Sequence, residues 1–282
     1  LRDNAGMARC ALNPETMQSK KYKIVPAKKQ KKVAIVGGGI GGMETARVLA
    51  LRGHKPTIFE KSGSLGGVFV AAAAPQFKSA DKALLRWYEK QMKDLQVDIR
   101  FNTEVKPSDT LTGFDEVVVA TGATAKRVPV KGAEKCIEAC DYLSGAPVGD
   151  KIVVIGGGLT GCEIALDAHL KGRTPVIVEM KNDLIAVKGV CLANSSYLRE
   201  YFALHKVEVH LESTVKEVGD GYVVVREKNG NEVKIPADTV VTSVGYTPAP
   251  LELKGAKYVG DCKEVGNLRT VIWRAWDVAM KI

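Results

Sequence analysis

The fold is decided by a stretch that occurs twice, first as Val33-Ala34-Ile35-Val36-Gly37-Gly38-Gly39-Ile40-Gly41-Gly42 and again as Ile152-Val153-Val154-Ile155-Gly156-Gly157-Gly158-Leu159-Thr160-Gly161. In each copy a β-branched run leads into a glycine turn, an amphipathic segment and a second β-branched run, which ends in Glu60 or Glu179. A β-branched run predicts a strand, and an amphipathic segment predicts a helix. The sequence therefore predicts one βαβ unit, present twice.

Both turns fit the pattern G-x-G-x-x-G, in which each glycine has its own task. The first permits a tight bend, the second lets a pyrophosphate approach the backbone, and the third lets the helix pack close to the strand. The N-terminus of the helix offers free N–H groups and the positive end of its dipole to the phosphates. The six glycines are Gly37, Gly39, Gly42, Gly156, Gly158 and Gly161.

Each turn is followed by an acidic residue at the end of the next strand, Glu60 in the first copy and Glu179 in the second. This is the position of a carboxylate that binds a ribose hydroxyl. A single copy could be a plain strand-to-helix turn, but two copies with two acids favour two dinucleotide sites. Because electron transfer needs a donor and an acceptor, two different dinucleotides are implied, and FAD with a nicotinamide nucleotide is the common pair.

The formal net charge of +9 is concentrated near the N-terminus. Residues 1–32 contain nine Lys or Arg, seven of them lysines between Lys20 and Lys32, against Asp3 and Glu15. A run of this kind predicts a solvated linker, with contact to an acidic partner surface as the alternative. We therefore expect no nucleic-acid binding.

The rest of the composition is that of a globular protein. No apolar run approaches the roughly 18 residues that a membrane-spanning helix needs, and the start lacks the apolar core of a signal peptide. A cytoplasmic protein without membrane contact is expected. The six scattered cysteines predict free thiols in a reducing compartment. A chain that starts at Leu1 suggests a fragment or a processed product.

Residues 32–282 resemble the two-dinucleotide-binding-domain flavoproteins, the superfamily of glutathione and thioredoxin reductases. Beyond the two turns, the resemblance rests on Leu65-Gly66-Gly67, Ala120-Thr121-Gly122, Gly245-Tyr246-Thr247-Pro248 and Gly260-Asp261. It implies an α/β fold of two Rossmann-like three-layer domains with parallel central sheets, the NAD(P)H domain being inserted into a discontinuous FAD domain. The expected parts are a tail and basic linker (1–32), an FAD domain (33–125 plus 239–282) and an NAD(P)H domain with its interdomain segment (126–238).

The same resemblance implies roles in FAD binding. The first glycine turn would hold the pyrophosphate, Glu60 the adenosine ribose, and the backbone of Val105 the adenine. Gly66 and Gly67 would lie beneath the flavin, and Asp261 would meet the ribityl and phosphate region. The other positions expected to contact FAD are Lys61, Ala120, Thr121, Gly122, Gly245 and Gly260.

By this resemblance the second glycine turn would bind NAD(P)H. Glu179 favours NADH, because a carboxylate accepts a hydrogen bond from the ribose 2′-OH and repels a 2′-phosphate. Lys181 and Arg173 lie close enough in sequence to leave NADPH open. Glu163 would lie near the nicotinamide, with an exposed helix carboxylate as the alternative.

The redox cysteine pair of the disulfide reductases is not found in the sequence. No C-x-x-C occurs, and the segment after Gly67 reads Val68-Phe69-Val70-Ala71. Cys136 and Cys140 have the spacing C-x-x-x-C in the interdomain stretch, where a catalytic disulfide is disfavoured, and Cys162 is expected to pack inside the second helix. Electrons must therefore leave the flavin by another route.

The N-terminal tail suggests that route. Cys10-Ala11-Leu12-Asn13-Pro14, before the lysine-rich segment, resembles the junction in the 2,4-dienoyl-CoA reductase and 2-enoate reductase family, whose members are NADH:flavin oxidoreductases like the old yellow enzymes. Those enzymes place an FMN barrel first, then four cysteines that bind [4Fe-4S], then the FAD and NADH domains. Cys10 would be the last cluster ligand, with a free surface cysteine as the alternative; the other three ligands and the barrel are absent from this chain.

These resemblances imply a module that moves hydride from nicotinamide C4 to flavin N5 without a catalytic side chain. Electrons would then pass through [4Fe-4S] and FMN in a missing N-terminal barrel to reduce the activated C=C bond of an enoate or enoyl substrate. Two alternatives stay open: a self-contained NADH:acceptor reductase of the diaphorase or ferredoxin type, and a non-catalytic nucleotide-binding redox sensor or scaffold. No catalytic role is expected for the four histidines, which are His54, His169, His205 and His210.

Overall fold

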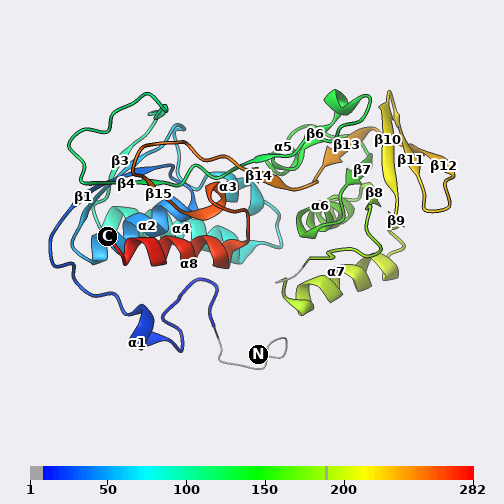
Figure 1. Ribbon diagram of the computed structural model, residues 1–282. Coiled ribbons are helices and arrows are strands. Elements are labelled where there is room, and N and C mark those ends of the chain that lie inside the picture. The colour runs from blue at the N-terminus through cyan, green and yellow to red at the C-terminus, as the bar shows by residue number, and fades with distance from the viewer. Residues whose placement is uncertain (1–8, 188–189) are drawn as a thin grey trace. The chain divides into compact units, whose positions relative to one another are not determined.

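The two repeated β-branched runs form the strands β1 (Lys32–Val36) and β7 (Lys151–Ile155) in the computed structural model, which describes residues 9–187 and 190–282 (Figure 1). Each strand lies in the middle of its own five-stranded sheet, where both faces are covered, as a continuous apolar run predicts. The chain divides into two units. The first consists of the described residues up to Ala73, Lys78–Thr124 and Tyr246–Ile282, and the second of Ala74–Phe77 and Ala125–Gly245.

The first unit contains a parallel sheet in the order β15-β4-β1-β2-β3. Its other strands are β2 (Lys55–Phe59), β3 (Asp98–Arg100), β4 (Glu116–Val119) and β15 (Lys257–Tyr258). Its helices are α1 (Ser19–Tyr22), α2 (Ile40–Leu51), α3 (Val68–Ala72), α4 (Ser79–Asp94), η2 (Gly260–Cys262) and α8 (Leu268–Ala279). Helices α4 and α8 flank α2, so that α2 is buried almost all round (Figure 1).

The main core of the first unit lies between its sheet and these helices. Ile35, Ile58 and Ile272 have no exposed surface there, and Trp276 of α8 is 2% exposed. Each such side chain contributes about 1.5–3 kcal/mol when it leaves water. The opposite face of the sheet is covered by loops, whose apolar side chains pack on Val36, Phe59 and other buried residues.

The second unit repeats this sheet, in the order β6-β13-β7-β8-β9. Its strands and helices are η1 (Ala133–Lys135), β6 (Ile137–Glu138), α5 (Ala139–Leu143), α6 (Leu159–Leu170), β8 (Thr174–Val178), α7 (Leu192–Leu204), β9 (Glu208–His210) and β13 (Thr239–Thr242). Both units therefore place the strand before the glycine turn at the centre and the next strand beside it.

An antiparallel sheet covers one face of the second unit. It consists of β10 (Thr214–Gly219), β11 (Tyr222–Arg226) and β12 (Glu232–Pro236), and a hairpin turn at Asn229-Gly230 joins the last two. Two short strands, β5 (Ala123–Ala125) and β14 (Tyr246–Pro248), form a separate sheet where the chain passes between the units. The α/β fold with two parallel Rossmann-like sheets, which the resemblance implies, is confirmed.

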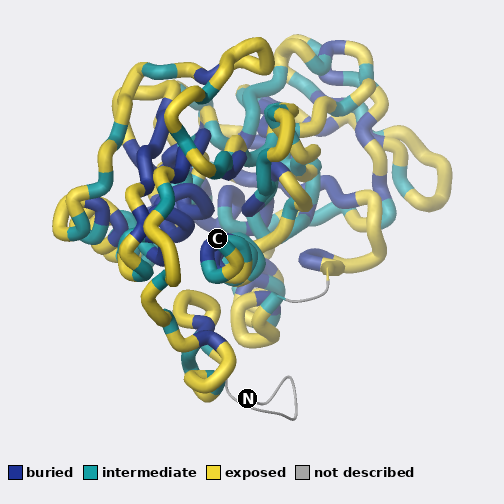
Figure 2. The backbone as a smooth tube through the Cα atoms, turned by 60° about the vertical axis from the view of Figure 1, so that its left-hand side comes forward, coloured by how far each residue is buried: buried dark blue, intermediate teal, exposed yellow. Residues whose placement is uncertain are grey.

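Two expectations about the ends of the domains differ from the structure. The border expected at 238/239 places β13 in the first domain, whereas β13 pairs with β6 and β7 in the second unit. A β-branched run predicts a strand but does not indicate which sheet it joins. The described part of the expected linker packs on the first unit, with Tyr22 only 6% exposed, because apolar residues alternate with the lysines (Figure 2).

In the described part of the chain, no helix is both long enough and apolar enough to cross a lipid bilayer.

Candidate functional site: two glycine turns with buried carboxylates

The first glycine of each turn has a backbone conformation that other residues rarely adopt. Gly37 has φ of 107° and Gly156 has φ of 109°. A Cβ atom at Gly37 would lie 2.5 Å from the carbonyl oxygen of Ala120, and one at Gly156 would lie 2.3 Å from that of Ser243. Both positions therefore require glycine. At each of them the turn contacts the residue that follows a neighbouring strand, β4 in the first unit and β13 in the second.

The third glycine of each turn allows helix and strand to approach each other. A Cβ atom at Gly42 would lie 1.9 Å from the carbonyl oxygen of Gly37, and one at Gly161 would lie 1.9 Å from that of Gly156. No side chain fits there. The structure thus gives these two glycines the packing task that the pattern predicts.

The middle glycines, in contrast, border open space. Gly158 has no heavy atom within 4 Å of its Cβ position, and Gly39 has only the carbonyl oxygen of Gly66, at 4.0 Å. These residues are the N-caps of α6 and α2, and neither cap is closed by a side chain. The first N–H groups of a helix have no partner within the helix. Each turn is therefore a cradle into which a diphosphate fits, held by backbone N–H groups and the helix dipole.

A carboxylate closes each turn in the same way. Glu60 is 7% exposed and accepts hydrogen bonds from the N–H of Gly38 at 2.7 Å and from the N–H of Ser62 at 2.8 Å. Glu179 is 8% exposed and accepts from the N–H of Gly157 at 2.6 Å and from the N–H of Lys181 at 2.8 Å. Backbone donors thus hold both carboxylates at the carboxyl end of the second strand.

The two carboxylates differ in the number of further hydrogen bonds that they can accept. Glu60 also accepts from the Ser62 hydroxyl at 2.7 Å, which makes three hydrogen bonds, whereas Glu179 has two. An ionised carboxylate offers about four acceptor positions. Both can therefore accept from a ribose hydroxyl, as their predicted role requires.

Basic residues near Glu179 are used elsewhere. Arg173 precedes β8 and donates to the carbonyl oxygens of Val148 and Gly149 at 2.8 and 2.5 Å. Because six residues of extended chain span about 20 Å, Arg173 lies at the end of the strand opposite to Glu179. The Lys181 ammonium donates to the carbonyl oxygen of Ala186 at 3.1 Å. Arg173 therefore cannot bind a 2′-phosphate placed beside Glu179.

The duplication continues into the loop after the third strand, a feature that the sequence analysis missed. Thr103 donates from its N–H to the carbonyl oxygen of Glu60 at 2.9 Å, and Ser213 donates likewise to that of Glu179 at 3.0 Å. Val105 and Val215 follow at the same spacing and are buried. The signal was present in the sequence, since residues 97–105 read VDIRFNTEV and residues 207–215 read VEVHLESTV.

The other predicted FAD residues of the first unit gather at its first turn. Gly66 donates from its N–H to the carbonyl oxygen of Gly38 at 2.9 Å, and the Cβ position of Gly67 is 3.4 Å from the Cα of Gly39. Gly260 lies 3.7 Å from the Cβ position of Gly41. Two motifs that are far apart in the sequence thus border one turn.

The remaining predicted residues are placed as follows. Thr121 donates from its hydroxyl to the carbonyl oxygen of Ala249 at 2.7 Å, and Gly122 accepts from the N–H of Ala249 at 3.1 Å. Asp261 accepts from the N–H of Gly266 at 3.0 Å, and burial raises its pKa. Lys61 is exposed beside Glu60. Gly245 has φ of 93°, and its carbonyl oxygen accepts a hydrogen bond from the N–H of Lys126 at 2.9 Å.

Glu163 and its counterpart in the first copy, Glu44, have different surroundings. Glu44 is 1% exposed and forms a two-pronged ion pair with Arg47, at 2.8 and 3.0 Å, and burial raises its pKa. Glu163 is only half-buried on α6. The first copy uses this position for a buried ion pair, whereas its counterpart on α6 is partly exposed.

The six cysteines are free thiols, and none is paired as a redox disulfide. Burial raises the pKa of Cys136 to about 11 and that of Cys162 to about 12. Cys10 is half-buried, and its carbonyl oxygen accepts a hydrogen bond from the indole N–H of Trp273 at 3.1 Å. Within residues 9–187 and 190–282, no three His, Cys, Asp or Glu side chains are grouped to hold a metal. These residues therefore do not fit a [4Fe-4S] cluster.

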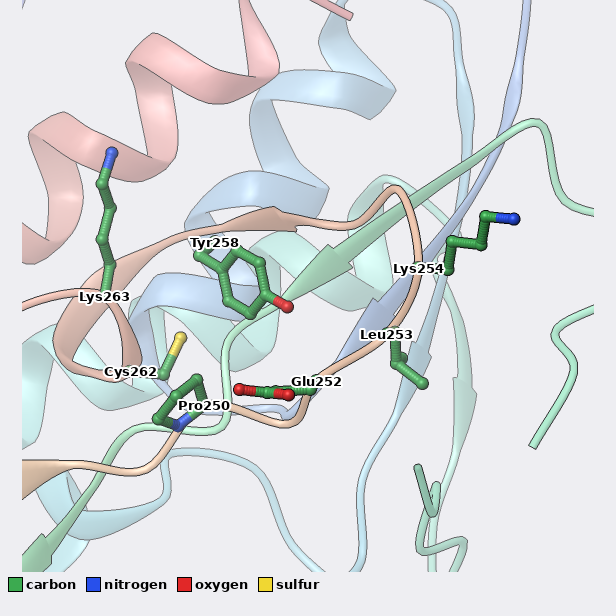
Figure 3. Close-up of a pocket in the computed structure, with 7 residues that line it drawn as sticks. All are labelled: Pro250, Glu252, Leu253, Lys254, Tyr258, Cys262 and Lys263. Atoms are coloured by element: carbon green, nitrogen blue, oxygen red, sulfur yellow. The ribbon is translucent and has the colours of Figure 1, made fainter. Parts of the chain in front are cut away.

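A surface hollow of about 750 Å³ also lies in the first unit, beside β15 and η2 (Figure 3). In it the Tyr258 hydroxyl and the Glu252 carboxylate point into the same space, while Lys254 and Lys263 extend away from it. Its other lining residues are Pro250, Leu253 and Cys262. None of the seven belongs to a glycine turn.

The profile of the pyridine nucleotide-disulphide oxidoreductases matches residues 11–113 and 106–265. The chain belongs to this family. Membership of the pyridine nucleotide-disulphide oxidoreductases implies FAD and NAD(P)H as cofactors, and both cradles fit a dinucleotide. The resemblance to two-dinucleotide-binding flavoproteins, inferred from the sequence, is confirmed.

Among curated members, the chain is 40% identical to cinnamate reductase of Clostridium sporogenes over 290 residues, which cover 99% of the chain and 43% of that protein. It is 33% identical to bilirubin reductase of Mediterraneibacter gnavus over 266 residues, which cover 90% of the chain and 41% of that protein. The chain thus spans less than half the length of these relatives. The 40% match agrees with the predicted resemblance to the enoate and dienoyl-CoA reductases.

Solved structures give the same result. A 2-naphthoyl-CoA reductase in complex with 2-naphthoyl-CoA superposes with a TM-score of 0.90 at 29% identity, covering 97% of this chain and 43% of that one. Thioredoxin reductase of Lactococcus lactis superposes with a TM-score of 0.71 at 19% identity, covering 89% and 97%. The second match is evidence for the fold alone.

Proposed function

We propose that this chain is the electron-input module of a flavoprotein reductase, with FAD in the first unit and NADH in the second. The observation that carries the proposal is the duplicated site: an open helix N-cap at Gly39 or Gly158 with a buried carboxylate, Glu60 or Glu179, beside it. The motifs that resemble flavin-contacting segments, at Gly66 and Gly260, border the first turn. We therefore assign FAD to that turn.

The chain's own residues bind and orient, and none acts as an acid or base. The cradles at Gly39 and Gly158 would each hold a diphosphate, and Glu60 and Glu179 would each accept a hydrogen bond from a ribose. When bound, FAD supplies the capacity to take a hydride from the nicotinamide. The contribution of the protein is to place the two rings in contact and to keep them aligned.

NADH is favoured over NADPH because of the charge at the second cradle. Glu179 repels a 2′-phosphate, and Arg173, the nearer guanidinium in sequence, is bound at the opposite end of β8. Glu163, half-buried on α6, would contact the nicotinamide end of the nucleotide.

We place the reduction of an activated C=C bond of an enoate or enoyl substrate in the part of the intact protein that extends beyond this chain. The relatives named for cinnamate and for 2-naphthoyl-CoA support that substrate class. In this proposal FMN, [4Fe-4S] and the barrel belong to that part, since Cys10 alone cannot hold a cluster.

The experiment is to purify the protein, determine its FAD content, and add NADH without oxygen. One FAD per chain and bleaching of the flavin absorbance by NADH are expected. Protein that takes up no FAD on reconstitution, or whose bound FAD is not reduced by NADH, would contradict the proposal.

A further inference from the structure

Residues 10–31, here called the strap, are fastened to the first unit by neutral contacts at their start. The indole N–H of Trp273, on α8, donates to the carbonyl oxygen of Cys10 at 3.1 Å. The ring of Tyr22 lies 5.4 Å from the ring of Trp273, and Tyr22 is 6% exposed. The buried ring of Tyr22 thus stabilises the start of the strap by apolar contact, in addition to the hydrogen bond between Trp273 and Cys10.

A second fastening lies at Arg52, the C-cap of α2. Its guanidinium donates to the carbonyl oxygens of Val25, at 3.2 Å, and Ala279, at 2.5 Å. Its own carbonyl oxygen accepts from the N–H of Ala27 at 2.9 Å. Arg52 therefore joins the strap, α2 and the end of α8 through one residue.

The end of the strap is bound as well. Gln30 donates from its side-chain amide to the carbonyl oxygen of Gly53 at 2.8 Å, and the N–H of Lys31 donates to Nδ1 of His54 at 3.2 Å. The five lysines between Lys20 and Lys29 are exposed. The charged side chains therefore face water while the backbone follows the unit.

Helix α8 connects the start of the strap with the first glycine turn. Val271 lies 3.4 Å from the Cβ position of Gly41 and 3.6 Å from that of Gly260. Trp273 follows two residues later on the same helix. The start of α8 is fixed by a capping box between Asn267 and Thr270. One rigid helix thus contacts the proposed FAD cradle and holds Cys10.

We propose that Trp273 and Arg52 are positioning residues, which hold the strap so that Cys10 and the residues after it keep a constant place relative to the flavin. The inference rests on the proposed function, in which the flavin passes its electrons to another part of the intact protein. The transfer moves electrons from the reduced flavin to an acceptor centre of that part, and the flavin is reoxidised. A loosened strap would vary the distance between donor and acceptor and would slow this transfer, but not the reduction of the flavin by NADH.

The test compares Trp273→Phe with the unsubstituted intact protein. Phenylalanine keeps one aromatic ring against Tyr22 and removes the N–H donor together with the second ring of the indole. Trp87→Phe, on α4, is the matched control, since Trp87 is 42% exposed and contacts Arg47 rather than the strap. Arg52→Ala removes the guanidinium bonds to Val25 and Ala279 and keeps the backbone bond to Ala27, and it should have the same effect as Trp273→Phe.

Two readouts are needed in each variant. Hydrogen exchange of residues 11–24 should become about fivefold faster after loss of one hydrogen bond. In anaerobic stopped flow with NADH, the first phase, reduction of FAD, should keep its rate. The second phase, in which electrons leave the flavin for the rest of the protein, should slow about tenfold, as expected for a small misplacement of reacting groups.

The outcomes separate the two proposals. Faster exchange with an unchanged second phase would overturn the positioning role, and unchanged exchange in both variants would overturn the fastening. If Trp87→Phe changed hydrogen exchange and the second phase as much as Trp273→Phe does, that result would also contradict the positioning role. If the unsubstituted protein shows no second phase after rapid FAD reduction, the onward transfer in the proposed function is wrong, and the positioning role is wrong with it.

Discussion

The carboxylate of Glu179 accepts a hydrogen bond from the backbone N–H of Gly157 at 2.6 Å, at the bend where the proposed NADH site begins. A hydrogen bond to a charged group contributes about 1.5–3 kcal/mol. This bond ties the end of β8 to the turn, and it points the carboxylate to the place where a ribose would lie. Glu60 and Gly38 repeat the relationship at 2.7 Å in the first unit.

Replacement of Glu179 by Gln should reduce the preference for NADH over NADPH. The amide is nearly isosteric and keeps an acceptor oxygen, but it no longer repels a 2′-phosphate. The KM for NADH should rise several-fold and the KM for NADPH should fall, as steady-state kinetics with both nucleotides would show. Glu60→Gln is the matched control: it should lower the retention of FAD and leave the ratio of the two KM values unchanged. Equal ratios in unsubstituted protein and Glu179→Gln would contradict the ribose assignment.

Arg173→Ala should affect stability and not nucleotide choice. Its guanidinium binds the carbonyl oxygens of Val148 and Gly149, so its removal should lower the free energy of unfolding by about 1–3 kcal/mol. Urea denaturation measures this loss. The KM for NADPH should stay the same, and a clear rise would mean that Arg173 reaches the nucleotide after all.

The cysteines Cys136 and Cys140 should be dispensable for electron transfer. With a pKa of about 11, the thiol of Cys136 is ionised in roughly 1 in 10,000 molecules at neutral pH, too few for efficient disulfide exchange. The double variant Cys136→Ser, Cys140→Ser should reduce its FAD with NADH at the unsubstituted rate. If the rate of FAD reduction fell more than tenfold while the FAD content was retained, a catalytic disulfide between Cys136 and Cys140 would be indicated.

Acid should weaken the fold partly through His54. Burial lowers the pKa of His54, with help from Arg52 and Lys31, and its buried Nε2 has no partner. Because the unfolded chain binds a proton below its ordinary pKa of 6.5 and the folded chain does not, His54 lowers stability as the pH falls below that value. His54→Phe should therefore show a smaller loss of unfolding free energy between pH 7.5 and 5.5. A loss equal to that of the unsubstituted protein would exclude this role.

The glycine turns and their carboxylates could be predicted because their task restricts the residue type. Only glycine fits beside the Gly37 carbonyl at Gly42, and the carboxylate of Glu60 accepts from the turn, so the pattern is visible in the sequence. The parallel sheets follow from the same repeat. At these positions the backbone geometry restricts which residue types fit, and the sequence therefore indicates that geometry.

Features that depend on packing between distant segments could not be predicted in this way. The lysines between residues 20 and 32 conceal Tyr22, whose burial depends on Trp273 near the other end of the chain. The placement of β13 depends on which sheet offers an open edge. The similarity between the segments that end at Val105 and at Val215 can be seen in the sequence. However, the number of residues between the glycine turn and this segment differs in the two copies, so the fixed offset that relates the two turns does not reveal it.

The central claim is that the two cradles hold different dinucleotides, and a pair of matched substitutions tests it most directly. A leucine at Gly39 or at Gly158 has room in the protein alone, since their Cβ positions border open space, but it would occupy the place of a diphosphate. The measurement is FAD content together with anaerobic flavin bleaching by NADH. Gly39→Leu should lose FAD, and Gly158→Leu should keep FAD but fail to reduce it with NADH. The opposite assignment, or normal FAD content and bleaching in both variants, would contradict the account.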